Sequence, residues 1–322
     1  MTGARFLGVD GGGTKTRFAL IDGEARLLAE ARLGTTYHPH AGLDGVREIL
    51  ACGVERVLAQ AGARPAEVAH AFFGLPAHGE DSRITPLLDA MPAAILGHER
   101  YACDNDMVCG WAGSLGCADG VNIVAGTGSI GYGQRQGRSA RAGGWGEAFS
   151  DEGSAYWIAI QGLNAFSRMS DGRLAKGPLH AIFREALGLG HDLDICAHVY
   201  GTRNYARGEL AQLSPLVAQA AQAGDPAALG IYRQAAQELA AIAASLRTAL
   251  EFEPRESVPL SYSGGAFAAG ELLLQPFAAA LHAASPAFEL RRPLHQPHYG
   301  AALYARKLAH DRPHGAAAGA VG

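Results

Sequence analysis

Close to its amino terminus the chain reads Phe6-Leu-Gly-Val-Asp-Gly-Gly-Gly-Thr-Lys-Thr-Arg-Phe-Ala-Leu-Ile21. Two short apolar runs flank a glycine-rich turn, which predicts strands over 6–10 and 16–21 joined as a hairpin. Glycine permits a tight turn and lets backbone N–H groups approach an anion closely. Because a strand follows the glycines, the loop is neither a Walker loop nor a dinucleotide-binding loop. It is therefore a candidate phosphate loop of another kind, although a single loop of this type is usually only a turn.

The same pattern returns about 115 residues further on, which favours the phosphate-binding interpretation. A strand is predicted over 120–125, a second glycine loop with a hydroxyl residue over 126–129, and another strand over 130–135. A repeat of this length indicates duplicated domains rather than a solenoid. The chain of 322 residues is also longer than one hydrophobic core usually supports.

The remaining pattern predicts an α/β chain whose second half is mostly helical. Apolar residues at helical spacing and short apolar runs locate the other elements. We predict helices over 42–61, 108–115, 229–250, 267–283 and 299–309, and strands over 26–31, 69–75, up to 104–106 and 258–263. The predicted domains are 1–117 and 118–310, with the helix 299–309 packing back on the first domain, followed by a disordered tail over 311–322.

Two aspartates lie where strands are predicted to end. Asp10 adjoins the first glycine loop, where a carboxylate suits a hydrated Mg²⁺ ion, although an aspartate there can also simply stabilise the turn. Asp106 precedes a helix and lies between the two loops in sequence. Phosphoryl transfer needs a carboxylate that orients and deprotonates the acceptor hydroxyl, which is the role we expect for Asp106. Asp104 is the rival for this role, and either residue can cap the helix.

A third unusual stretch is Gly143-Gly-Trp-Gly146, followed by Ser150-Asp-Glu-Gly-Ser154. We expect Ser150 to be the N-cap of a helix with Asp151 and Glu152 in its first turn. The glycines expose backbone amides beside an indole face, which suits a polar sugar. A well-capped helix and a sugar site are compatible interpretations of this stretch.

Composition excludes several other classes of protein. The net charge of −4 offers no electrostatic footprint for nucleic acid or an anionic membrane. Five cysteines without a CxxC pair predict reduced thiols, and Cys103, Cys109 and Cys117 lack the spacing of a metal site. No secretory leader precedes Phe6 and no apolar run reaches 18 residues, so we expect a cytoplasmic enzyme.

Taken together, these motifs resemble the N-acetylglucosamine kinase branch of the BadF/BadG/BcrA/BcrD ATPase family. The resemblance is carried, in order along the chain, by Asp10–Thr16, Asn105-Asp106, Ala125–Ser129, Gly143–Gly146, Asp151–Trp157, Ser263–Ala266 and Gly300–Ala302. It implies two ribonuclease-H-like domains of the actin-like ATPase type with ATP and Mg²⁺ in the cleft between them. The implied reaction is phosphorylation of the 6-hydroxyl of N-acetylglucosamine or glucosamine, and a homodimer is plausible from the family.

The resemblance also implies a role for particular residues. Asp106 is the implied base, and Asp10 is implied to hold Mg²⁺ through water. The implied phosphate ligands are Gly11, Gly12, Gly13, Thr14, Lys15, Gly126, Thr127, Gly128 and Ser129, with Gly264, Gly265 and Ala266 against the adenosine. The implied sugar site consists of Tyr37, His38, Asp106, Gly144, Trp145 and Asp151.

Three departures from the family pattern leave the acceptor open. Relatives carry an asparagine near Tyr37 and His38, often a histidine in place of Glu147, and a glycine in place of Ser150. N-acetylglucosamine, glucosamine, N-acetylmuramic acid and other hexoses remain candidate acceptors. The alternative functions are an ATPase activator of a 2-hydroxyacyl-CoA dehydratase, which would need an iron–sulfur cluster, and a sugar-binding regulator. Acceptor-dependent ATP consumption distinguishes a kinase from both.

Overall fold

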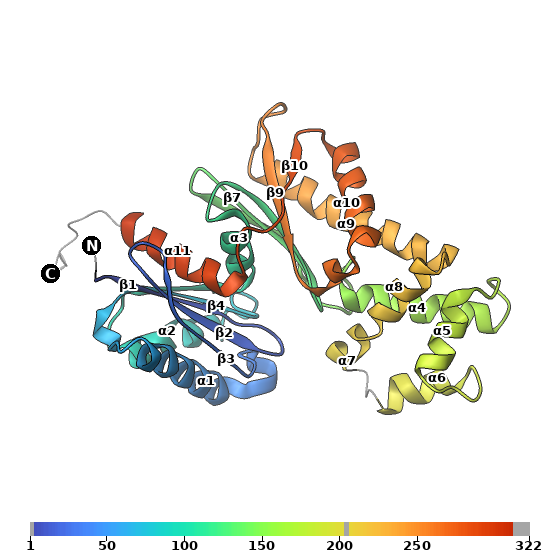
Figure 1. The fold of residues 1–322 in the computed structure, drawn as a ribbon, viewed down its shortest axis with the longest axis horizontal. Helices are drawn as coiled ribbons and strands as arrows, with labels where there is room; N and C mark the ends of the chain where they lie inside the picture. Colours follow the sequence, from blue (N-terminus) through green and yellow to red (C-terminus); the bar gives the residue numbers. More distant parts are fainter. Residues whose placement is uncertain (1–2, 203–205, 312–322) are drawn as a thin grey trace. The chain divides into compact units, whose positions relative to one another are not determined.

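The computed structural model describes residues 3–202 and 206–311, and its chain divides into two units (Figure 1). Unit 1 comprises Met1–Ala118 together with Pro293–Gly322, and unit 2 comprises Asp119–Arg292. The chain therefore leaves unit 1 once and returns to it for the last helix. No helix within the described residues is both long and apolar enough to cross a membrane.

Unit 1 is built on a five-stranded mixed sheet with the order β3-β2-β1-β4-β5. β1, β2 and β3 are antiparallel neighbours because short turns join them, whereas β4 and β5 are parallel to β1 and follow helical connections. Parallel order brings the carboxyl ends of β1, β4 and β5 to one edge of the sheet. The strands are β1 (Arg5–Asp10), β2 (Thr16–Asp22), β3 (Leu27–Leu33), β4 (Val68–Leu75) and β5 (Tyr101–Asn105).

Helices cover both faces of this sheet (Figure 1). On one face, α1 and α2 pack with the strands into an apolar core that includes Val9, Phe18 and Leu50. On the other face, α11 lies so close to β1 that a Cβ atom on Gly8 would be 2.1 Å from the backbone nitrogen of Ala302. The helices of unit 1 are α1 (His38–Gln60), η1 (Pro65–Glu67), α2 (Thr85–Leu96), α3 (Met107–Leu115) and α11 (Pro297–Asp311).

The sheet of unit 2 has the order β8-β7-β6-β9-β10, which matches the order β3-β2-β1-β4-β5 in unit 1. This repeat is the duplication expected from the sequence. Its strands are β6 (Gly120–Ala125), β7 (Ser129–Arg135), β8 (Arg138–Gly143), β9 (Val258–Ser263) and β10 (Phe288–Leu290). The helical layer is larger and its core includes Ile158, Phe166 and Leu239. Its helices are α4 (Ala155–Ser170), α5 (Pro178–Ala186), α6 (Asp194–Cys196), η2 (Ala197–Thr202), α7 (Arg207–Ala211), α8 (Ser214–Gln222), α9 (Pro226–Ala249), η3 (Gly265–Ala269) and α10 (Glu271–Ala284).

The structure corrects three local predictions. The helix expected to start at Ser150 starts at Ala155, because Ser154 is the N-cap and its hydroxyl accepts the amide of Trp157. The single helix expected over 267–283 is divided by Gly270, whose φ of 62° no helix tolerates. Of the tail expected over 311–322, Asp311 belongs to α11, and residues 312–322 lie outside the described part of the chain.

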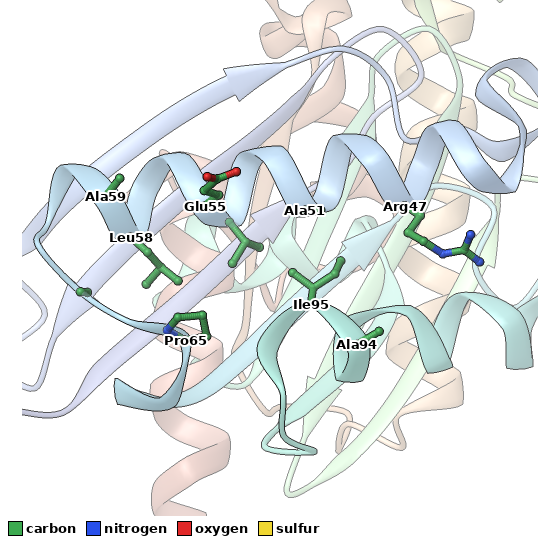
Figure 2. A pocket seen from close by; sticks show the side chains of 10 residues that line it. Arg47, Ala51, Glu55, Leu58, Ala59, Pro65, Ala94 and Ile95 are labelled. Carbon is green, nitrogen blue, oxygen red and sulfur yellow. The ribbon is translucent and has the colours of Figure 1, made fainter.

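A groove of about 540 Å³ lies between α1 and α2, with Leu58 and Ile95 among the side chains on its walls (Figure 2). Its lining is mainly alkyl, and Arg47 and Glu55 are its charged members. The candidate site residues do not contribute to this lining. They lie at the loops that follow the strands.

Candidate active site

The first glycine loop is held at the carboxyl end of β1 by neighbouring backbone and hydroxyl groups. The amide of Gly11 donates to the carbonyl oxygen of Gly74 at 2.8 Å, and the hydroxyl of Thr35 donates to the carbonyl oxygen of Gly12 at 2.7 Å. A Cβ atom on Gly11 would lie 2.4 Å from the hydroxyl oxygen of Thr36, so this position requires glycine. The next three residues, 13–15, are exposed and accessible to a ligand.

The carboxylates of Asp10 and Asp106 interact electrostatically at this edge of the sheet. Burial, and then the negative charge of Asp106, raise the pKa of Asp10 from 3.8 to about 8, while Arg17 and Lys15 act in the opposite direction. A divalent cation would relieve the repulsion between the two carboxylates and favour the ionised form of Asp10. The two carboxylates are therefore compatible with the Mg²⁺ ion that the family resemblance implies, which Asp10 would hold through water.

Asp106 is positioned by the turn that joins β5 to α3. It is the N-cap residue of α3, and the amide of Cys109 donates to its carbonyl oxygen at 3.0 Å. The side chain of Asn105 accepts the amide of Met107 at 3.2 Å and donates to the carbonyl oxygen of His78 at 3.3 Å. Asp104, the rival carboxylate, accepts the amide of Asn105 at 2.7 Å. The buried amide of Asn105 thus fixes the turn that carries Asp106.

Tyr37 and His38 lie next to the same loop. The amide of Tyr37 donates to the hydroxyl of Thr35, the residue that bonds to Gly12. Tyr37 precedes α1, and its ring packs edge-on against His40 with the centroids 4.9 Å apart. Unit 1 therefore places Asp10, Asp106 and the Gly11–Lys15 loop at one edge of its sheet, and the backbone of Tyr37 is linked to this loop through Thr35. His38 follows Tyr37 at the start of α1.

The second glycine loop, Gly126–Ser129, connects β6 to β7 and is held by the turn that precedes α4. The amide of Ala155 donates to the carbonyl oxygen of Gly126 at 2.9 Å, and the hydroxyl of Ser129 donates to the carbonyl oxygen of Glu152 at 2.6 Å. The amide of Ser129 donates to Oδ1 of Asp151 at 3.3 Å. No hydrogen bond among the described residues uses the amides of Thr127 and Gly128. These two N–H groups suit a phosphate oxygen.

Asp151 is buried against this loop in a left-handed backbone conformation. It is 2% exposed and its φ is 62°. Burial raises the pKa of Asp151, and the strongest opposing influence is the positive charge of Arg207. Arg207 hydrogen-bonds through Nη2 to Oδ2 of Asp151, and its Nε lies 3.4 Å from a carboxylate oxygen of Glu147.

The Gly264–Ala266 turn lies directly beside the second loop. Gly264 has a φ of 101°, and a Cβ atom there would be 2.4 Å from the carbonyl oxygen of Ala125. Gly265 is open, whereas Ala266 is buried. On the other side of β7, Gly144 lies against Ile130, and the Trp145 side chain is 72% exposed. An exposed indole of this kind is available to a ligand.

Comparison with known proteins identifies the family. A model of the BadF/BadG/BcrA/BcrD ATPase family matches residues 7–305. The chain belongs to this family. The resemblance inferred from the sequence is thereby confirmed.

Three relatives of this family member cover nearly its whole length. It is 29% identical over 309 residues to the N-acetyl-D-glucosamine kinase of Dictyostelium discoideum, with 93% of this chain and 97% of the relative covered. It is 27% identical over 301 residues to the N-acetylmuramic acid/N-acetylglucosamine kinase of Clostridium acetobutylicum, with the same coverage of 93% and 97%. A crystal structure from Chromobacterium violaceum, proposed to be that of an N-acetylglucosamine kinase, superposes with a TM-score of 0.74 at 25% identity and covers 94% of this chain and 98% of its own. The predicted actin-like fold class is confirmed.

In this member of the BadF/BadG/BcrA/BcrD ATPase family, the structure adds residues that the sequence analysis missed. Thr35 and Thr36 support the first loop, and Arg207 lies against the second. The threonines directly precede the expected site residues Tyr37 and His38, so their place in the sequence could have identified them. Arg207 lies 56 residues from Asp151 in a helical region without a motif, and no sequence signal indicates it.

Proposed function

We propose that this chain is an ATP-dependent amino-sugar kinase that transfers the γ-phosphoryl group to the 6-hydroxyl of N-acetylglucosamine or glucosamine. The observation that carries the proposal is the arrangement of Asp106 beside Asp10 and the Gly11–Lys15 loop. It joins a candidate base, a candidate metal ligand and exposed N–H donors at one edge of a sheet. The names of relatives that cover almost the whole chain support the amino-sugar acceptor.

Each unit supplies part of the proposed chemistry. In unit 1, Asp106 accepts the proton of the acceptor hydroxyl as that oxygen attacks the γ-phosphorus and the bond to the β-phosphate oxygen breaks. Asp10 would hold Mg²⁺ through water, and the ion would supply positive charge for the phosphate oxygens. In unit 2, the amides of Thr127 and Gly128 bind phosphate oxygens, and Gly264 to Ala266 pack against the adenosine. Lys15 and the amides of Gly12, Gly13 and Thr14 bind phosphate from unit 1, while Gly11 attaches the loop to Gly74.

The proposed acceptor ligands are Tyr37, His38 and Asp106 in unit 1, and Gly144, Trp145 and Asp151 in unit 2. Trp145 offers an exposed indole face to the apolar face of a sugar ring, and Asp151 offers a carboxylate to sugar hydroxyls. Mg²⁺ as the cofactor, a cytoplasmic location and a homodimer complete the proposal, and light scattering of the purified protein tests the dimer.

The decisive assay measures ADP release from MgATP with N-acetylglucosamine, glucosamine, N-acetylmuramic acid, glucose or no sugar. We expect strong stimulation by an amino sugar and loss of activity with excess EDTA. Phosphorus NMR of the product identifies the phosphorylated hydroxyl. ADP release that is equal with every sugar and without sugar would refute the kinase, and iron content would then test the dehydratase activator.

A further inference from the structure

The two glycine loops differ in the charge that their own sequences carry. The unit 1 loop ends in Lys15, so a cation accompanies its N–H donors. The unit 2 loop, Gly126-Thr-Gly-Ser129, has no cation, and the buried carboxylate of Asp151 lies against it instead. A polyphosphate bound to this loop would meet an uncompensated negative charge. Binding there requires a cation from elsewhere in the unit.

Arg207 lies in the position to supply that charge. A Cβ atom on Gly128 would be 2.1 Å from Nη2 of Arg207, so the guanidinium rests directly on the loop backbone. The same Cβ atom would be 2.9 Å from Oδ2 of Asp151. Glycine at 128 thus makes room for the Arg207–Asp151 pair. The Arg207 side chain is 32% exposed, which leaves it accessible to a ligand.

The guanidinium also has donors to offer. It carries five N–H donors in a fixed planar arrangement that matches phosphate oxygens. Nη2 donates to Asp151, and the buried Nε lies 3.4 Å from Glu147 without a hydrogen bond to any described residue, so these two nitrogens face the carboxylates. The two carboxylates orient the guanidinium over the loop without using all its donors.

We propose that Arg207 binds the phosphate chain of ATP at the Gly126–Ser129 loop, with Asp151 and Glu147 holding the guanidinium in place. The proposal rests on the proposed function in assigning this loop to nucleotide phosphates. Arg207 then plays at the second loop the part that Lys15 plays at the first. Lys15 belongs to its loop, whereas Arg207 belongs to a helix and lies 78 positions after Ser129 in the chain. Such an enzyme acts largely by stabilising the negative charge on the phosphoryl group during its transfer.

The test compares the equilibrium binding of adenosine, ADP and ATP, each with Mg²⁺, to the full-length protein and its variants by titration calorimetry. We expect Arg207→Met to weaken ATP binding by about 10- to 100-fold while adenosine binding changes less than about twofold. Arg207→Lys keeps the charge but loses the planar donors, so an intermediate loss is expected. Arg233→Met, which removes an exposed arginine of α9, is the matched control.

An equal loss for adenosine and ATP, or no loss at all, would overturn the proposal, because only a phosphate contact distinguishes these ligands. If Arg207→Met does not fold, Glu147→Gln decides instead. Removing this carboxylate takes away one of the two groups that orient the guanidinium, so ATP affinity should fall while adenosine affinity changes less than about twofold, and an unchanged ATP affinity contradicts the proposal. The sugar-stimulated ADP release of the unmodified protein is measured in parallel. Absence of sugar stimulation refutes the kinase, while a phosphate-dependent effect of Arg207 still supports the nucleotide contact.

Discussion

The amide of Gly11 donates a 2.8 Å hydrogen bond to the carbonyl oxygen of Gly74. This bond attaches the first glycine loop to the end of β4. Gly74 also packs against the start of α3, since a Cβ atom there would be 2.2 Å from the sulfur of Cys109 and 3.2 Å from the Cα atom of Asp106. One glycine thereby keeps the candidate phosphate loop and the candidate base in register, and the predictions below test what that arrangement does.

Replacing the candidate base should abolish most of the activity without affecting nucleotide binding. For Asp106→Asn we expect kcat to fall by about 10²- to 10⁴-fold, because the amide cannot accept the proton of the acceptor hydroxyl. The Kd for MgATP should change little. Sugar-stimulated ADP release and calorimetry measure the two quantities. Asp104→Asn is the matched control, and a greater loss in that variant would transfer the role of base to Asp104.

The raised pKa of Asp10 predicts a pH-dependent stability of the ligand-free protein. Between the ordinary pKa of 3.8 and the folded value of about 8, the folded state retains a proton that the unfolded state has released. This carboxyl group therefore lowers the free energy of unfolding progressively as the pH rises from 4 to 8. Asp10→Asn removes the effect, so its melting temperature should exceed that of the unmodified protein more at pH 8 than at pH 5.

Calorimetric melting at the two pH values measures this difference, and each ~1 kcal/mol corresponds to roughly 2–4 °C in a unit of this size. Asp44→Asn, an exposed carboxylate on α1, is the control and should show no such pH dependence. Added Mg²⁺ should stabilise the unmodified protein at pH 8 and have less effect on Asp10→Asn. A constant melting difference across this pH range would contradict an elevated pKa for Asp10.

The adjacent glycines 264 and 265 should differ sharply in their tolerance of alanine. Gly264→Ala places a methyl group 2.4 Å from the carbonyl oxygen of Ala125 at a φ of 101°, and we expect a loss of about 2–4 kcal/mol in stability. It should also weaken ATP binding, since the second loop begins at the next residue, Gly126. Gly265→Ala meets open space and should remain within ~0.5 kcal/mol. Urea denaturation of both variants makes the comparison, and equal stabilities would be inconsistent with the close packing of Gly264.

The helix cap of α4 provides a fourth test. Ser154→Ala removes the hydroxyl that accepts the amide of Trp157 and should cost about 1 kcal/mol. Ser150→Ala, the cap expected from sequence alone, should cost less because the hydroxyl of Ser150 donates to the Glu152 side chain at 3.1 Å and to no backbone group of the described residues. The urea midpoints of the two variants show which of the two serines contributes more to stability. A larger loss for Ser150→Ala would restore the original assignment of the cap.

The sequence by itself indicated the duplicated sheets and the fold class, and it supplied the residues of the candidate site, whose roles stay predictions. The strand–glycine–strand pattern at Asp10 and again at Gly126 depends on local backbone requirements, and local requirements are readable from neighbouring residues. The same holds for the position of Asp106, which lies between the end of β5 and the start of α3. The prediction failed at Ser150, because Ser154 is a serine too and the packing of Asp151 against the loop places the helix start after Ser154.

The tertiary structure alone decided which distant residues meet. Asp10 owes its raised pKa to burial and to the charge of Asp106, and neither quantity exists until β1 and α3 are packed together. Arg207 and Asp151 pair across 56 positions of chain, with Gly128 making room for the contact. Periodicity and turn chemistry act over a few residues, whereas electrostatic coupling and close packing depend on distances that only the folded chain sets.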